Sequence, residues 1–159
     1  SNLGDRQNML SQALERISFA NTLVKVSEIY EAYPRRGGRN ESFLNCCVEI
    51  ETDMAPFQLL QFLKETEKQL NSTHAEGENL HRFIDLDLID YAGRVVRTPE
   101  LTLPHPDAHR RAFVMIPLAE IKPEWEHPIL RAKAKDLAQE AYWDGWGHFF
   151  ATGKSLLDF

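Results

Sequence analysis

The chain has 159 residues, 43% of them hydrophobic, which suits a single domain over 1–159 with one continuous core. Its 18 basic and 24 acidic residues give a net charge of −6, which argues against a nucleic-acid binder that relies on general attraction to phosphate. No apolar run approaches the roughly 20 residues that a bilayer requires, and nothing resembles a secretory signal. We therefore expect neither nucleic acid nor a membrane as a partner.

The two cysteines, Cys46 and Cys47, are adjacent in the sequence. On a strand, neighbouring side chains point to opposite faces, so these thiols are not expected to form a disulfide with each other. The absence of a disulfide framework predicts a reducing, cytoplasmic setting.

Hydrophobic periodicity divides the first half of the chain into helices and strands. Met9, Ala13 and Ile17 recur at helical spacing, whereas the segments on either side of the basic, glycine-bearing loop 34–40 are rich in residues that favour strands. Pro56 suits the first turn of a second helix. In chain order, we predict a helix over 5–17, strands over 22–30 and 43–50, a helix over 56–70 and a polar loop over 71–79.

The second half continues with a strand over 83–91, which Gly93 turns into a short partner over 94–96. A proline-containing loop follows, and then helices are predicted over 112–121, which contains Pro117, and over 132–142. This order predicts an α+β sandwich with helices on a mainly antiparallel sheet. Because residues 1–5 look like a loop that leaves a strand, we also expect one strand to be missing before the first helix.

Asp85 and Asp87 form the first candidate site. Strand alternation places both carboxylates on one face, about 7 Å apart at the backbone, while Ile84, Leu86 and Leu88 point into a core. Aspartate is rare in strands, and two like charges on one face repel unless a cation neutralises them, which favours Mg²⁺. The alternative is a solvated edge strand with two acids facing water, and the octet 82–89 leaves both interpretations open.

Further motifs surround this pair in a specific order. Asp-Leu-Asp-Leu-Ile at 85–89 precedes Thr-Pro-Glu-Leu-Thr-Leu-Pro-His-Pro at 98–106, Arg-Ala-Phe-Val at 111–114 and Pro-Leu-Ala-Glu-Ile at 117–121. Upstream stand Ser-Asn-Leu-Gly-Asp-Arg at 1–6 and Phe-Leu-Asn at 43–45. Over residues 1 to about 125, the chain resembles the family of 6-hydroxymethyl-7,8-dihydropterin pyrophosphokinases (2-amino-4-hydroxy-6-hydroxymethyldihydropteridine diphosphokinases).

The resemblance implies a ferredoxin-like α+β sandwich and an ATP-dependent diphosphokinase of folate biosynthesis. Such an enzyme transfers diphosphate from ATP to 6-hydroxymethyl-7,8-dihydropterin and gives AMP. The resemblance further implies that Asp85 and Asp87 bind two Mg²⁺ ions together with ATP. Arg82 matches an arginine that contacts phosphate, so Arg82, Asp85 and Asp87 form the implied catalytic set.

The resemblance also assigns the substrate residues. Asn45 would hydrogen-bond the pterin, and Phe113 would stack on its ring with Phe43 beside it, as suits a flat heteroaromatic ring. The implied nucleotide residues are Glu67, Arg82, Thr102, His105 and Arg111. The alternatives are local roles: a strand hydrogen-bonder for Asn45, core residues for the phenylalanines, a turn-stabilising imidazole or hydroxyl for His105 and Thr102, and surface cations for the arginines.

The loop 72–81 departs from the family pattern, because further arginines, a tryptophan and a Gly-Pro pair are absent from it. Arg35, Arg36 and Arg39 would compensate if loop 34–40 swung inward; the alternative is an ordinary surface loop. The departure favours, as a second hypothesis, an impaired paralogue that binds pterin or nucleotide.

The C-terminal segment from about 132 lies outside the clear resemblance. Its aromatic residues recur near helical spacing and predict a helix packed on the body or a contact with a second copy in a homodimer. A third hypothesis, a non-enzymatic ferredoxin-like regulatory module, would use this segment as its working surface. The aromatic residues concerned are Tyr142, Trp143, Trp146, Phe149 and Phe150.

Overall fold

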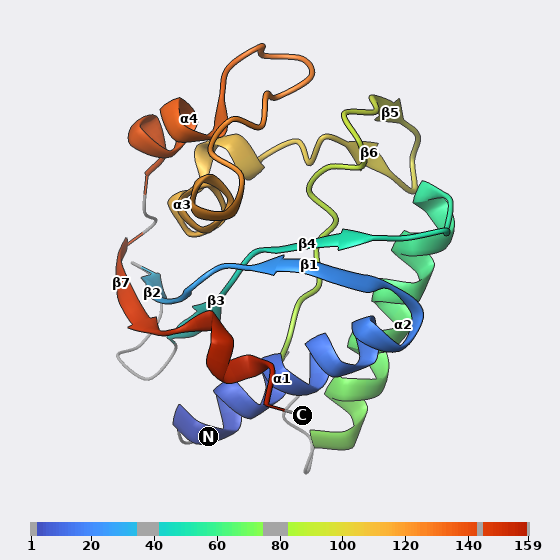
Figure 1. Cartoon of the computed structure of the whole chain (residues 1–159), viewed down its shortest axis with the longest axis vertical. Coiled ribbons are helices and arrows are strands. Elements are labelled where there is room, and N and C mark those ends of the chain that lie inside the picture. Colours follow the sequence, from blue (N-terminus) through green and yellow to red (C-terminus); the bar gives the residue numbers. More distant parts are fainter. Residues whose placement is uncertain (1–2, 35–41, 75–82, 143–144, 159) are drawn as a thin grey trace.

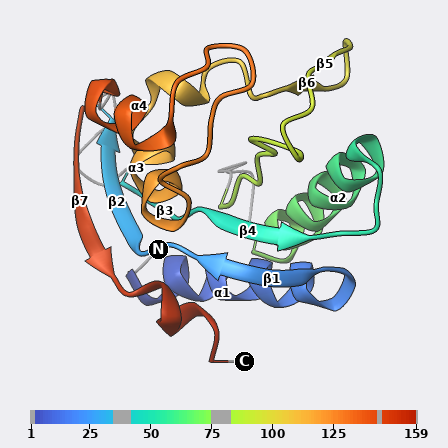
Figure 2. The same cartoon turned by 45° about the horizontal axis from the view of Figure 1, so that its top comes forward.

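The computed structural model describes residues 3–34, 42–74, 83–142 and 145–158. Its elements form three layers (Figures 1 and 2), in which two strands separate one pair of helices from another. The predicted α+β class is confirmed. The middle layer contains β1 (Thr22–Val26) and β4 (Val48–Glu51), the first helical layer α1 (Leu3–Ala20) and α2 (Pro56–His74), and the second α3 (Ala112–Ile121) and α4 (Ala134–Glu140).

Each of the two strands predicted over 22–30 and 43–50 is divided in two. β1 pairs with β4, while β2 (Ile29–Pro34) lies between β3 (Phe43–Asn45) and β7 (Gly145–Ala151), and all these pairs are antiparallel. Ser27 lies in the break between β1 and β2, and Cys47 lies in the break between β3 and β4. These two positions lie opposite each other. The Ser27 N–H donates to the Cys47 carbonyl at 2.9 Å, and the fully buried Ser27 hydroxyl accepts from the Cys47 N–H at 2.8 Å.

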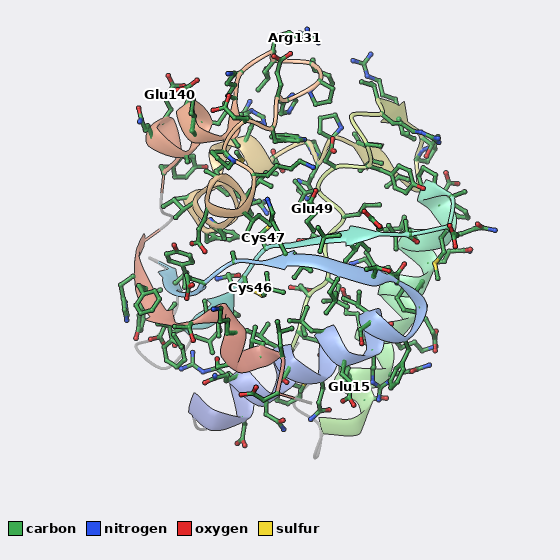
Figure 3. The ribbon with its side chains drawn as sticks, in the orientation of Figure 1. Glu15, Cys46, Cys47, Glu49, Arg131 and Glu140 are labelled. Atoms are coloured by element: carbon green, nitrogen blue, oxygen red, sulfur yellow. The ribbon has the colours of Figure 1, made fainter. Side chains whose placement is uncertain are left out.

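The two cysteines point to opposite faces, as predicted. Cys46 packs with Leu14 and Ile29, whereas Cys47 packs with Met115 and its neighbours on the α3 side (Figure 3). Both thiols are free, and burial raises the pKa of each to about 12. They are therefore core side chains of the strand layer.

The prediction of a strand over 83–91 is wrong, but the predicted alternation of inward-facing and outward-facing side chains is right. Residues 83–90 form no strand ladder, and their trace crosses behind β4 in Figure 1. Ile84, Leu86 and Leu88 nevertheless pack among residues of α1 and α2. Side chains of α2 bind the backbone of this segment, so the side-chain alternation survives without a described neighbouring strand.

The remaining elements agree in part with the sequence. α1, α3 and α4 correspond to predicted helices, but α2 continues to His74 through the first part of the predicted loop. The turn at Gly93 forms with φ 70°, yet β5 (Val96–Arg97) pairs with β6 (Thr102–Leu103) instead of with 83–91. Within the described ranges, none of the helices has both the length and the apolar character needed to cross a membrane.

The helical interpretation is wrong for Trp146, Phe149 and Phe150, because residues 145–151 form β7 and pair with β2. Trp143 lies outside the described residues. Gly145 and Gly147 weaken a helix, and aromatic residues are favoured in strands. The chain then enters the short helix η2 (Gly153–Leu156), whose fully buried Leu156 packs against α1. Gly153 is required there, because an added Cβ would lie 1.9 Å from the Ser27 carbonyl oxygen.

Candidate functional site

The two aspartates of segment 83–90 both face outward. Asp85 and Asp87 are exposed, whereas Ile84 on the opposite face is only 6% exposed. Burial of the apolar side chains on α1 and α2 therefore presents both carboxylates on one side of the segment, as the alternation predicted. Their metal-binding role stays a prediction.

Asp87 lines an open pocket of about 240 Å³. Thr102 and His105, which the resemblance assigns to the nucleotide, line the same pocket, and so does Lys64 of α2. The His105 N–H donates to the Ile89 carbonyl at 2.8 Å, which fastens the loop 104–107 to the aspartate segment. The other lining residues are Leu60, Leu88, Pro99, Glu100, Leu101 and Pro106.

The His105 ring is held by its own turn. Its Nδ1 accepts the Asp107 N–H at 3.2 Å, so the neutral ring carries its proton on Nε2. The turn-stabilising alternative is thus present, and it leaves Nε2–H as a donor. The two interpretations of His105 are compatible because they use different nitrogen atoms.

Lys64 and Glu67 place charge beside the aspartates. The Lys64 ammonium lies 2.9 Å from Glu67 Oε2 and 4.0 Å from Asp87 Oδ1. Glu67 Oε2 also accepts the Leu86 N–H at 2.9 Å, so its mostly buried carboxylate is shared between the lysine and the aspartate segment. Sequence reasoning missed Lys64, although its spacing of three residues from Glu67 on a helix could have suggested the pair.

Arg111 and Phe113 stand together at the start of α3. The Arg111 guanidinium lies 6.0 Å from the centre of the Phe113 ring and 3.7 Å from Asp107 Oδ2. Phe113 is half-buried. The arginine therefore has an aromatic neighbour and a carboxylate partner, both near His105 in the chain.

On the predicted pterin side, Asn45 and Phe43 belong to β3. Asn45 is half-buried opposite Tyr30 of β2, and Phe43 is 53% exposed. α3 packs against β2 and β4, and Glu120 of α3 accepts the Tyr30 hydroxyl at 2.6 Å. Burial and this hydrogen bond raise the pKa of Tyr30. The fold thus fixes the helix of Phe113 to the sheet of Asn45.

The half-buried His109, which lies between His105 and Arg111 in the chain, contacts the buried His127. His109 belongs to the short helix η1 (Ala108–Arg110), and its ring lies edge-on to that of His127 at 5.5 Å. His127 is 5% exposed, and its Nδ1 accepts the N–H groups of Ile129 and Leu130. Burial lowers the pKa of both histidines, and each is lowered further by a neighbouring cation, Arg110 or the other histidine. Nothing in the sequence pattern indicated this pair.

The structure brings only part of the predicted site into one pocket. Among the described residues, the pocket lining includes Asp87, Thr102 and His105 but not Asp85, Glu67 or Arg111. The predictions for Arg82, Arg35, Arg36 and Arg39 lie outside the described residues. Within the described ranges, no group of three or more His, Cys, Asp or Glu side chains is arranged to hold a metal ion.

The fold and the pocket alone do not define a reaction, because one fold can support many activities. Residues 1–123 match the 7,8-dihydro-6-hydroxymethylpterin-pyrophosphokinase (HPPK) family. The chain belongs to this family. The resemblance seen in the sequence is therefore confirmed, and with it the enzyme class, an ATP-dependent diphosphotransferase of folate biosynthesis.

Named relatives agree with this assignment. The 2-amino-4-hydroxy-6-hydroxymethyldihydropteridine pyrophosphokinase of Bacillus subtilis is 40% identical over 123 residues, covering 76% of this chain and 73% of the relative. The enzyme of the same name from Aquifex aeolicus is 33% identical over 140 residues, covering 88% and 87%. The folic acid synthesis protein FOL1 of Dictyostelium discoideum is 35% identical over 130 residues, covering 82% of this chain but 20% of that longer protein.

The pair of His109 and His127 predicts an acid-sensitive fold. Because the folded-state pKa values of His109 and His127 are lowered, the folded chain binds fewer protons than the unfolded chain, so their contribution to stability is complete above the ordinary histidine pKa of about 6.5. It is lost as the pH falls below that value. Urea unfolding at pH 8, 6.5 and 5.5 should therefore show a falling free energy of unfolding.

His127→Asn tests this origin, because an amide oxygen can accept the same two N–H groups and cannot gain a charge. The variant should match the wild type closely at pH 8 and lose less stability towards pH 5.5. Equal losses for both proteins would rule out His127 as a source of the acid sensitivity.

Proposed function

We propose that this chain, as a single domain over 1–159, transfers the diphosphoryl group of ATP to the hydroxymethyl group of 6-hydroxymethyl-7,8-dihydropterin. Membership of the HPPK family over residues 1–123 carries the proposal. The position of Asp87 beside Thr102 and His105 in one pocket supports it, because these are residues assigned to metal and nucleotide.

The reaction joins the substrate hydroxyl oxygen to the β-phosphorus of ATP and breaks the bond between that phosphorus and the oxygen bridging it to the α-phosphorus. AMP leaves with the bridging oxygen, and the hydroxyl proton is released late or to a water molecule. Such a transfer depends mainly on positioning and charge stabilisation. The protein therefore has to hold two substrates in line and exclude alternative geometries.

The aspartate pair fits Mg²⁺. Both carboxylates are hard oxygen donors, both are exposed on one face, and Mg²⁺ is commonly held by one or two carboxylates together with substrate phosphates. We propose that Asp85 and Asp87 hold two Mg²⁺ ions with ATP. When bound, Mg²⁺ would neutralise charge on the phosphates.

For the substrates, we propose that Thr102, His105, Arg111, Glu67 and Arg82 form the nucleotide side. His105 would donate its Nε2–H, because Nδ1 is already used in the turn. Asn45 would bond the edge of the pterin, with Phe113 and Phe43 against its ring faces. The attachment of α3 to β2 through Glu120 and Tyr30 supports this grouping.

The first test is the formation of AMP from ATP and 6-hydroxymethyl-7,8-dihydropterin with Mg²⁺. Asp85→Asn and Asp87→Asn should each lower kcat at least about a hundredfold, as expected when charge stabilisation is lost in the transition state. Asp136→Asn, in the first turn of α4, serves as the matched control and should retain the activity. AMP formation at the wild-type rate in both aspartate variants would contradict the assignment.

The second test separates the two nitrogen atoms of His105. Glutamine imitates Nε2 and asparagine imitates Nδ1, so His105→Gln should keep ATP affinity within about threefold while His105→Asn loses about tenfold, the cost of a hydrogen bond to a charged group. Titration calorimetry with ATP and Mg²⁺ measures both. If His105→Asn binds ATP better than His105→Gln, the turn bond is the role that matters.

A specific observation keeps the impaired paralogue as a second candidate. The segment 72–81 lacks the family's additional arginines, tryptophan and Gly-Pro pair, groups that would stabilise the transferred charge. Pterin binding by a chain that forms no AMP would favour this candidate. Failure to bind either ligand would favour the regulatory module.

We also propose that the chain forms a homodimer through its C-terminal aromatic residues. The two free cysteines support our proposal of a reducing, cytoplasmic setting. Tyr142 and Phe149 are 59% and 54% exposed. Sedimentation velocity should then show a dimer that Phe149→Ser weakens. A monomer at all concentrations would exclude the dimer.

A further inference from the structure

One face of α2 binds the backbone of the aspartate segment. Asn71 Oδ1 accepts the N–H groups of Phe83 at 2.8 Å and Ile84 at 3.1 Å, and Asn71 Nδ2 donates to the Ile84 carbonyl at 3.0 Å. A single amide side chain thus satisfies both backbone groups of Ile84, the residue before Asp85.

The same pattern repeats one turn earlier on the helix. Glu67 accepts the Leu86 N–H at 2.9 Å, and the Lys64 ammonium donates to the Leu86 carbonyl at 3.3 Å. The three helical residues are spaced by three and four, so they share one face of α2. Together they bind both backbone groups of Ile84 and of Leu86.

This contact fixes the direction of the aspartates. In an extended segment, alternate residues direct their backbone groups to the same edge, so anchoring Ile84 and Leu86 to α2 orients the peptide planes on both sides of Asp85 and before Asp87. The apolar contacts of these residues hold the segment in the core, but such contacts are not directional, whereas hydrogen bonds are.

We propose that Asn71, together with Glu67, is a positioning residue that aligns the Asp85 and Asp87 carboxylates for a divalent cation. The inference rests on the proposed metal role of the two aspartates. Asn71 touches neither carboxylate in the described contacts and acts through the backbone. Partners that orient metal ligands in this way commonly change metal affinity 10- to 100-fold when they are removed.

The experiment compares the wild-type chain with Asn71→Leu, whose side chain has the same branching and no hydrogen-bonding group. Mn²⁺ is the probe, and its affinity is measured by electron paramagnetic resonance with and without ATP. Amide hydrogen exchange measures directly the protection of the backbone N–H groups of Phe83, Ile84 and Leu86. Ser72→Ala is the matched control, because the Ser72 hydroxyl bonds the Gln69 carbonyl within the helix.

We expect Asn71→Leu to lose protection of the Phe83 and Ile84 amides and to bind Mn²⁺ at least about tenfold more weakly. Asn71→Asp keeps the oxygen that accepts both N–H groups, so it should retain their protection and bind Mn²⁺ better than Asn71→Leu. It also keeps the test decisive if the leucine variant does not fold. Ser72→Ala should behave as the wild type.

Wild-type Mn²⁺ affinity in Asn71→Leu, or unprotected Phe83 and Ile84 amides in the wild type, would overturn the inference even if the enzyme forms AMP. Weaker Mn²⁺ binding in Asn71→Leu together with no AMP formation by the wild type would support the positioning role while the proposed function fails. Failure of the positioning role and failure of the proposed function therefore give different results.

Discussion

The alternating burial of residues 84–88 is the constraint on which the candidate site depends. Ile84, Leu86 and Leu88 are held among α1 and α2 side chains, and their burial forces Asp85 and Asp87 to the other side. Returning an aspartate to the core would bury a charge, which is far more costly than losing one apolar contact. The packing of the apolar side chains therefore also sets the direction of the two carboxylates.

The polar contacts around this segment complement the apolar ones. Asn71, Glu67 and Lys64 bind one edge of the segment, and the His105 N–H binds the Ile89 carbonyl. The short helix η1, which directly follows the loop of His105, carries His109 against the buried His127. A continuous set of contacts thus links α2, the aspartates and the nucleotide-side loop, as a site built on rigid elements requires.

The strand layer provides the second support. Ser27 hydrogen-bonds Cys47 where the chain leaves β1 for β2 and β3 for β4, and Cys46 and Cys47 face opposite layers at that point. Because Glu120 fastens α3 to Tyr30 of β2, the helix that carries Phe113 stays close to the sheet that carries Asn45. The contact between α3 and β2 therefore fixes the predicted pterin residues relative to each other.

The sequence by itself determined the α+β class, the outward direction of Asp85 and Asp87, the opposite faces of Cys46 and Cys47, and the family. These depend on local periodicity and on residue order, which the sequence contains directly. It did not determine that 83–90 lacks a strand ladder, that 145–151 is a strand, or that Lys64 and Asn71 reach the aspartate segment. Strand pairing and side-chain contacts to a distant backbone depend on which segments become neighbours, and only the tertiary structure decides that.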